Sequence, residues 1–266
     1  FSANRAIRQL DIALAHRPWF MSDASSALRH RYLDLLAGCL CRDLFLEAEP
    51  GVDPTVRADG RDWPSSAETM IGRRRLANLV ECLTMVLDDD IPGDLIETGV
   101  WRGGATILMR GALAAWGDEG RSVWVADSFQ GLPPPDGVAW PADEGIDLSG
   151  VETLAVPRSV VEANFARYGL LDARVRFLEG WFADTLPAAP IGRLALLRLD
   201  GDLYQSTWEA LEHLYPKLSV GGIVIVDDHG AFEPCRRAVA DYREQYDITD
   251  EIVPVDWTGV WWRRSQ

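Results

Sequence analysis

Residues 92–105 read PGDLIETGVWRGGA, and the architecture of the whole chain can be argued outward from them. The apolar segment 94–98 has the composition of a buried strand, and glycines at 99, 103 and 104 follow it before a helical pattern begins. A short buried strand that passes through a glycine-rich turn into a helix is typical of a parallel sheet covered by helices. We therefore expect strands and helices to alternate along the chain.

The rest of the sequence shows this alternation. The expected strands are 94–98, 122–127, 174–179, 194–199 and 222–226, and the expected helices are 69–88, 104–116, 158–168, 206–216 and 233–246. Continuous apolar strands separated by helices predict a parallel sheet with both faces covered. The last segments, 249–255 and 259–264, predict an antiparallel hairpin at one edge. The predicted fold class is α/β, with a mostly parallel sheet and an antiparallel C-terminal edge.

Two helical patterns, 5–20 and 28–46, precede the sheet. The second places four leucines on one side: Leu33, Leu36, Leu40 and Leu44. Residues 47–66 are rich in Asp, Pro, Gly and Ser, which predicts a mobile loop. We expect an N-terminal helical and lid region over 1–66 and a main domain over 67–266.

Composition narrows the classes of partner. A chain of 266 residues with 47% hydrophobic residues can bury a large core, and its net charge of −15 argues against binding to nucleic acid or to an anionic membrane. No apolar run approaches the ~20 residues of a membrane span, and the start lacks the apolar core of a signal peptide. We expect a cytoplasmic protein that acts on small molecules, with a homo-oligomer left open.

The four cysteines lack metal-site spacing and are expected to be buried free thiols.

The glycine turn after the first strand points to a cofactor. It matches neither G-x-G-x-x-G nor G-x-x-x-x-G-K-S/T, the two patterns of phosphate-binding loops. Glu97 precedes the turn, and its carboxylate would repel a pyrophosphate and attract a cation. S-adenosylmethionine, a nucleoside with a positively charged amino-acid tail, fits this chemistry, and an ordinary strand-to-helix turn is the alternative. The expected cofactor contacts here are Glu97, Thr98, Gly99 and Val100.

The next two strand ends supply the rest of the expected cofactor site. Asp127, followed by Ser128, ends the second strand, where a carboxylate can accept hydrogen bonds from both ribose hydroxyls of a nucleoside. Gly180, Trp181 and Phe182 follow the third strand and offer aromatic faces to an adenine ring. The two aromatic residues could equally belong to the core.

The fourth and fifth strands end in clustered carboxylates, in LLRLDGDLY (196–204) and IVIVDDHG (223–230). Neighbouring strand tips lie about 5 Å apart, so Asp200, Asp227 and Asp228 must converge. A divalent cation would relieve their repulsion, and all-oxygen ligands favour Mg²⁺. The alternative is a structural cluster with Arg or Lys partners. Asp202 is a further ligand, a base or a solvated loop acid.

A divalent cation beside a sulfonium cofactor implies methyl transfer to oxygen. The cation would lower the pKa of a substrate hydroxyl and hold its oxygen in line with the methyl group. A nearby carboxylate would then accept the hydroxyl proton.

Several long motifs, in order, resemble those of the macrocin O-methyltransferase family, bacterial enzymes that methylate sugar hydroxyls of macrolides and aminocoumarins. The matching stretches are YLDLL (32–36), ETMIG (68–72), PGDLIETGVWRGGA (92–105), VWVADSFQG (123–131), RYGLLD (167–172), VRFLEGWFADTLP (175–187), LRLDGDLY (197–204) and DDHG (227–230). The resemblance implies a class I methyltransferase fold, S-adenosylmethionine, Mg²⁺ held by Asp200, Asp227 and Asp228, and a glycosylated small molecule as acceptor.

The resemblance also bears on the catalytic base. The metal arrangement is similar to that of catechol methyltransferases, in which a lysine three residues after the first metal aspartate is the base. That position is Leu203 here, which leaves Asp202 or Asp200 as the catalytic base. A small-phenol methyltransferase and an inactive cofactor-binding partner protein remain alternatives. A hydride-transfer enzyme is least favoured, because the dinucleotide glycine pattern is missing.

Parts of the chain depart from the family pattern. Residues 1–27 extend its usual start, and residues 132–157 match it poorly. We expect 132–157 and 47–66 to order as a lid when substrate binds. Thr69 and Met70, at the start of the helix expected over 69–88, are predicted to face the methionine end of the cofactor.

Overall fold

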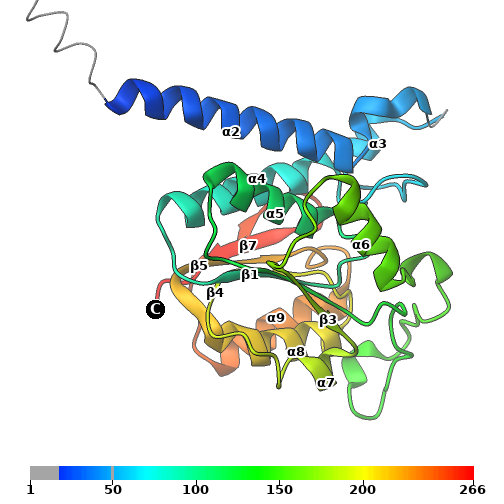
Figure 1. The fold of residues 1–266 in the computed structure, drawn as a ribbon. Coiled ribbons are helices and arrows are strands. Elements are labelled where there is room, and N and C mark those ends of the chain that lie inside the picture. The colour runs from blue at the N-terminus through cyan, green and yellow to red at the C-terminus, as the bar shows by residue number, and fades with distance from the viewer. Residues whose placement is uncertain (1–17, 49–50) are drawn as a thin grey trace, which may run out of the picture.

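The structure of the protein is a computed structural model that describes residues 18–48 and 51–266. A seven-stranded sheet in the order β3-β2-β1-β4-β5-β7-β6 forms its centre (Figure 1). Strands β1 to β5 are parallel, whereas β7 runs antiparallel to both β5 and β6. The predicted α/β fold with an antiparallel C-terminal edge is confirmed.

The elements lie close to their predicted positions. The strands are β1 (Asp94–Thr98), β2 (Val123–Asp127), β3 (Val175–Glu179), β4 (Leu194–Leu199), β5 (Leu218–Val226), β6 (Val253–Pro254) and β7 (Val260–Arg263). The α-helices are α2 (Pro18–Leu40), α3 (Pro54–Ala58), α4 (Gly72–Asp88), α5 (Gly104–Trp116), α6 (Arg158–Arg167), α7 (Phe182–Thr185), α8 (Tyr204–Leu214) and α9 (Glu233–Gln245). Short 3₁₀ helices are η1 (Asp43–Ala48), η2 (Pro141–Asp143), η3 (Glu152–Leu154) and η4 (Tyr215–Lys217).

The sheet separates two hydrophobic cores. Helices α4 and α5 cover one face with α2 outside them, and α8 and α9 cover the other (Figure 1). Successive strand residues point to opposite faces, so Leu95 belongs to the core under α4 and α5, and Ile96 to the core under α8 and α9. Both faces of the parallel strands are therefore buried, which explains their continuous apolar sequences.

The helix expected over 28–46 ends earlier, at Leu40, and its last part is wrong. Arg42 adopts a left-handed backbone conformation (φ 60°), and its guanidinium donates to the Cys39 carbonyl (2.8 Å) and to Glu68 Oε1 (2.7 Å). This turn redirects the chain, so Leu44 lies in η1 and is 46% exposed. The other three predicted leucines of the face are buried: Leu33, Leu36 and Leu40.

Residues 47–66 were expected to be loop, and the prediction missed a short helix. Asp53 accepts a hydrogen bond from Thr55 N (2.7 Å) and caps α3, whose first residue is Pro54. An Asp-Pro pair is a helix-start signal, and the loop-like composition around it hid that signal. The end of α3 packs against Gly72, where a side chain would collide with the backbone of Gly60. This contact fixes the start of α4 at Gly72, three residues after the predicted start at Thr69.

The helix expected over 5–20 falls almost wholly outside the described residues. The division into 1–66 and 67–266 stays a prediction, and α2 packs directly on α5.

Three cysteines are buried free thiols as predicted, whereas Cys39 is only half-buried. Within residues 18–48 and 51–266, every helix is too short or too polar to span a membrane.

Candidate active site

The carboxyl ends of the parallel strands open into a cavity of about 630 Å³. It lies where the strand order reverses between β1 and β4, which is the usual ligand position in such sheets. Gly99 directly follows β1 there with φ +83°, and a Cβ atom on it would overlap the carbonyl oxygen of Asp200, which directly follows β4. The two strand tips therefore touch through a glycine.

The cavity brings together the predicted site residues with one exception. Those that line it are Thr69, Met70, Glu97, Gly99, Val100, Asp127, Ser128, Gly180, Trp181, Phe182, Asp200, Asp202, Asp227 and Asp228. Thr98 does not line it: this residue is buried in β1, and its hydroxyl donates to the carbonyl of Arg198 (3.5 Å). Thr69 and Met70 reach the cavity from the turn before α4 rather than from a helix.

Asp127 organises the turns at the cofactor side of the cavity. Its Oδ2 accepts from Val100 N and its Oδ1 from Phe129 N, each at 2.7 Å. Burial raises the pKa of this carboxyl group, and the backbone N–H donors oppose that rise. A carboxylate oxygen can accept a second hydrogen bond, so Asp127 remains able to accept from a nucleoside. The hydroxyl of Ser128 is already used, since it donates to Gly131 O (2.7 Å).

Glu97 places a buried carboxylate in the wall of the cavity. Its side chain is 2% exposed and forms an ion pair with Arg198 through Oε1. The other oxygen, Oε2, is buried without a hydrogen-bond partner. Burial, together with nearby Asp200 and Asp227, raises the pKa of Glu97 to about 8, although Arg198 lowers it. A ligand with an ammonium group would satisfy the unpaired oxygen.

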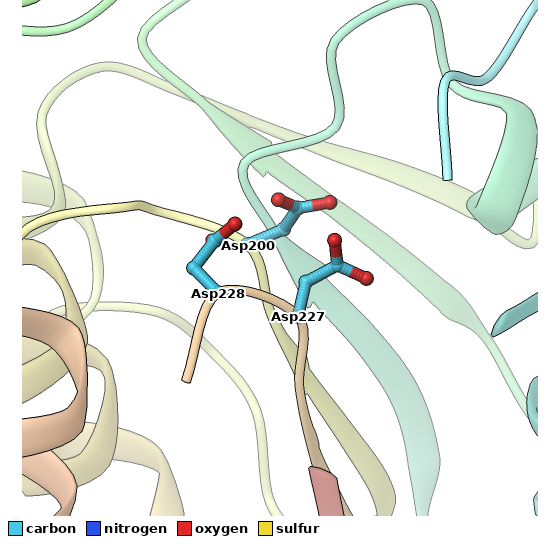
Figure 2. Close-up of side chains that lie close together, drawn as sticks. All are labelled: Asp200, Asp227 and Asp228. Carbon is cyan, nitrogen blue, oxygen red and sulfur yellow. The ribbon is translucent and has the colours of Figure 1, made fainter. Parts of the chain in front are cut away.

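Asp200, Asp227 and Asp228 converge as predicted from their positions at the ends of β4 and β5 (Figure 2). One carboxylate oxygen from each lies within 4.8 Å of the others. Burial raises the pKa of Asp200 and, more strongly, that of Asp228, and the neighbouring carboxylates raise both further. Three hard oxygen donors on adjacent strand tips fit a divalent cation such as Mg²⁺.

Two arginines that the sequence reasoning missed compensate part of this charge. Arg198 in β4 is 1% exposed, and its guanidinium donates to Glu97, to Asp200 Oδ2 (2.6 Å) and to Asp227. Arg75 in α4 donates to Asp227. The sequence did carry one signal for Arg198: it is a single basic residue in an apolar strand that ends in acids.

The arginines do not reach every acid of the cluster. No ion pair within the described residues reaches Asp228, which accepts from Asp202 N at 3.2 Å. The structural alternative, in which basic partners neutralise the acids, therefore explains Asp200 and Asp227 but leaves Asp228 uncompensated. Asp228 is thus the acid of the three without a basic partner among the described residues, and a bound cation would supply that partner.

Asp202 is a half-buried acid in the wall of the cavity rather than a solvated loop acid. It lines the cavity, and its backbone is in the left-handed region (φ 62°), which is uncommon for a residue with a side chain. Burial first, and then Asp200 and Asp227, raise the pKa of Asp202 to about 7. A carboxyl group in this range can exchange a proton near neutral pH.

The turn between β6 and β7 also enters the site, which the sequence did not reveal. Thr258 Oγ1 donates to Asp227 O (2.8 Å), and Thr258 O accepts from Gly230 N (2.8 Å). The adjacent Trp257 lines the cavity and donates through Nε1 to Asp59 O (2.9 Å). The C-terminal hairpin thus holds the loop that carries Asp227 and Asp228.

Comparison with known proteins places this chain among methyltransferases. Residues 29–264 match the family model described as Macrocin-O-methyltransferase (TylF). A Streptomyces olivaceus protein, 8-demethyl-8-(2,3-dimethoxy-alpha-L-rhamnosyl)-tetracenomycin-C 4'-O-methyltransferase, is 54% identical over 249 residues, which cover 89% of this chain and 94% of that protein. Demethyldecarbamoylnovobiocin O-methyltransferase of Streptomyces niveus is 50% identical over 245 residues, covering 88% and 94% respectively.

A solved structure extends this likeness to the fold. The structure of the O-methyltransferase NovP superposes with a TM-score of 0.87 at 50% identity, covering 90% of this chain and 100% of that chain. The class I methyltransferase fold expected from the resemblance is thereby confirmed.

Removal of the Arg198 charge should make stability depend on a divalent cation. We expect Arg198→Met to lower the free energy of unfolding by about 3–5 kcal/mol, because it leaves buried carboxylates unpaired. Saturating Mg²⁺ should restore more stability to this variant than it adds to the wild type. Urea unfolding with and without Mg²⁺ measures both effects. Arg176→Met, on the exposed side of β3, is the control. An equal gain from Mg²⁺ in wild type and Arg198→Met would contradict charge compensation by Arg198.

Asp127→Asn should weaken binding of S-adenosylhomocysteine by about 10- to 100-fold, because a charge-assisted acceptor is lost. The matched control is Asp94→Asn, at the opposite end of β1, whose carboxylate also accepts two N–H groups, from Ser122 N (2.9 Å) and Trp124 Nε1 (2.8 Å). Titration calorimetry measures the two affinities. Equal effects of the two substitutions would mean that Asp127 acts only by holding its turns.

Proposed function

Because the chain belongs to the macrocin O-methyltransferase family, we propose that it moves a methyl group from S-adenosylmethionine to a sugar hydroxyl of a glycosylated natural product in antibiotic biosynthesis. The proposal includes dependence on Mg²⁺, action in the cytoplasm, and no nucleic-acid or membrane partner. Its main support is one cavity that joins Glu97 and Asp127 to the carboxylates at the ends of β4 and β5. The relatives' names specify acceptors that carry a sugar or derive from novobiocin.

Residues at or just after the ends of three strands, β1, β2 and β3, would each contact a different part of the cofactor. Asp127 would accept from the ribose hydroxyls, and Glu97 Oε2 would accept from the cofactor's amino group. Trp181 and Phe182, which line the cavity after β3, would pack against the adenine. The ends of β4 and β5, which line the same cavity, would then be left for the acceptor hydroxyl.

Asp200, Asp227 and Asp228 would hold Mg²⁺. When bound, the cation supplies Lewis acidity that lowers the pKa of the acceptor hydroxyl. Arg198 holds Asp200 Oδ2 and one oxygen of Asp227, so it fixes the direction of both carboxylates. A site that is oriented before the acceptor arrives reduces the reorganisation needed for reaction.

Asp202 would accept the proton of the sugar hydroxyl as the methyl group moves. S-adenosylmethionine would supply the methyl group, exchanging its carbon–sulfur bond for the new carbon–oxygen bond, and would leave as S-adenosylhomocysteine. Asp202 suits this role better than Asp200, because Asp200 is held by Arg198 and would also bind the cation. The pKa of Asp202, raised to about 7 by burial, also favours proton uptake near neutrality.

Methyl transfer to glycosides tests the proposed function directly. We expect the protein, S-adenosylmethionine and Mg²⁺ to methylate a member of a panel that includes demethyldecarbamoylnovobiocin, rhamnosyl tetracenomycins and catechols. Dialysis against EDTA should abolish turnover, and added Mg²⁺ should restore it. Mass spectrometry identifies the methylated product. Full turnover after metal removal would sink the metal-dependent mechanism, and methylation of catechols alone would favour the small-phenol alternative.

Asp202→Asn should lower kcat by about 10²- to 10⁴-fold while leaving the affinity for S-adenosylhomocysteine unchanged, because the amide keeps the shape of the side chain but cannot accept a proton. Asp247→Asn is the control, since Asp247 has a similar left-handed backbone (φ 53°) and does not line the cavity. Single-turnover kinetics and calorimetry measure the two quantities. Wild-type kcat in Asp202→Asn would reassign the base to Asp200.

A further inference from the structure

Asp143 lies in the segment 132–157, here called the strap. Its carboxylate accepts hydrogen bonds from residues that are distant in the sequence. Its side chain is 1% exposed. The Oδ1 atom accepts from Tyr204 N (2.7 Å), and Oδ2 accepts from Gln205 N (3.0 Å). These are the first N–H groups of α8, whose N-cap residue Leu203 provides no side-chain cap. Asp143 therefore caps α8 from the strap.

An aromatic contact supports the same docking position. The ring of Trp140 lies 5.9 Å from that of Tyr204, centroid to centroid. Tyr204 stacks on Trp208 at 5.9 Å with an interplanar angle of 6°, and Trp208 meets Tyr242 edge-on. The strap thus rests on a row of rings that continues into the core between α8 and α9.

The C-terminal part of the strap is attached to the glycine turn after β1. Trp101, in the glycine turn after β1, donates through Nε1 to Thr153 O (2.8 Å). The strap therefore spans the cavity from the cofactor turn to the start of α8. Six of its residues line the cavity, and five of them are apolar: Leu132, Pro133, Pro134, Leu148 and Leu154, with Asp136 as the sixth.

The residues that Asp143 caps lie close in sequence to Asp202, the proposed base. Tyr204 follows Asp202 by two residues, and the Ser206 hydroxyl donates to Leu203 O (3.1 Å) in the same turn. The carboxylates at the ends of β4 and β5 form the polar side of the cavity, and the strap forms an apolar side. An acceptor with a polar sugar and an apolar aglycone would match both sides.

We propose that Asp143 is a positioning residue that fixes the strap as the wall against which an apolar aglycone binds. The inference rests on the proposed function, because it takes the sugar of a glycoside to be the methylated part. The strap selects the acceptor by its aglycone, and the carboxylates select the hydroxyl. Asp143 contacts neither cofactor nor acceptor, and it acts through α8 and the strap.

The test compares Asp143→Ala with Asp147→Ala. Asp147 lies in the same strap, is exposed, and accepts only from Ser149, through N (2.9 Å) and Oγ (2.6 Å), so it controls for local loosening of the strap. Hydrogen exchange of peptides from 132–157 needs no acceptor and reports docking directly. We expect exchange about tenfold faster in Asp143→Ala than in wild type or Asp147→Ala, because the cap is lost. Asp143→Asn, which keeps one acceptor oxygen, should lie between them.

The kinetic part uses demethyldecarbamoylnovobiocin or a rhamnosyl tetracenomycin, whichever the wild type methylates, beside free L-rhamnose. In Asp143→Ala, the KM for the glycoside should rise about tenfold, whereas the KM for free rhamnose and the affinity for S-adenosylhomocysteine should not change. Unchanged exchange in the strap would overturn the docking role of Asp143. Faster exchange with an unchanged glycoside KM would overturn the aglycone wall. Absence of methylation by the wild type would instead refute the proposed function, and hydrogen exchange would still decide whether Asp143 docks the strap.

Discussion

The buried guanidinium of Arg198 is the interaction on which the arrangement of the site depends. Parallel strands bring all their carboxyl ends to one edge, and here three of those ends, from β1, β4 and β5, carry acids that line the cavity. Unpaired, these carboxylates would repel one another in a medium of low dielectric constant. Arg198 binds one acid from each strand, Glu97, Asp200 and Asp227, and so joins the three tips. The same contacts leave Glu97 Oε2 and the carboxylate of Asp228 available for other positive charge.

Much of the fold could be predicted because its signals are local. Apolar runs of five or six residues between helical patterns located β1 to β4 to within one residue. The failures arose where long-range contacts override local patterns. Leu44 continues the apolar periodicity of α2, but the contact of Arg42 with Glu68 turns the chain before it. In 47–66, composition typical of a loop concealed the cap and proline that begin α3.

The candidate site was predictable where it depends on local sequence signals and not where it depends on long-range contacts. Residues at strand ends must share one edge of a parallel sheet, so sequence position alone placed Asp127, Asp200 and Asp227 together. The partners of these acids depend on register, which no local pattern encodes. Glu97 lies directly opposite Arg198 across β1 and β4, and this pairing appears only when the strands are aligned. Asp143 sits in a strap without periodicity, so nothing near it in sequence indicated that it would cap α8.

The attachment of the β6–β7 turn to the loop after β5 has a consequence for how the protein is made. Translation delivers Asp227 and Asp228 well before Thr258, whose hydroxyl and carbonyl tie their loop down. On the ribosome, the strands β1 to β5 can assemble while the loop with two of the acids still lacks its support. The loop after β5 gains this support only when β7 pairs with β5. In a nascent chain, the turns after β1 and β2 would therefore form before the loop with Asp227 and Asp228 gains its hydrogen bonds to Thr258.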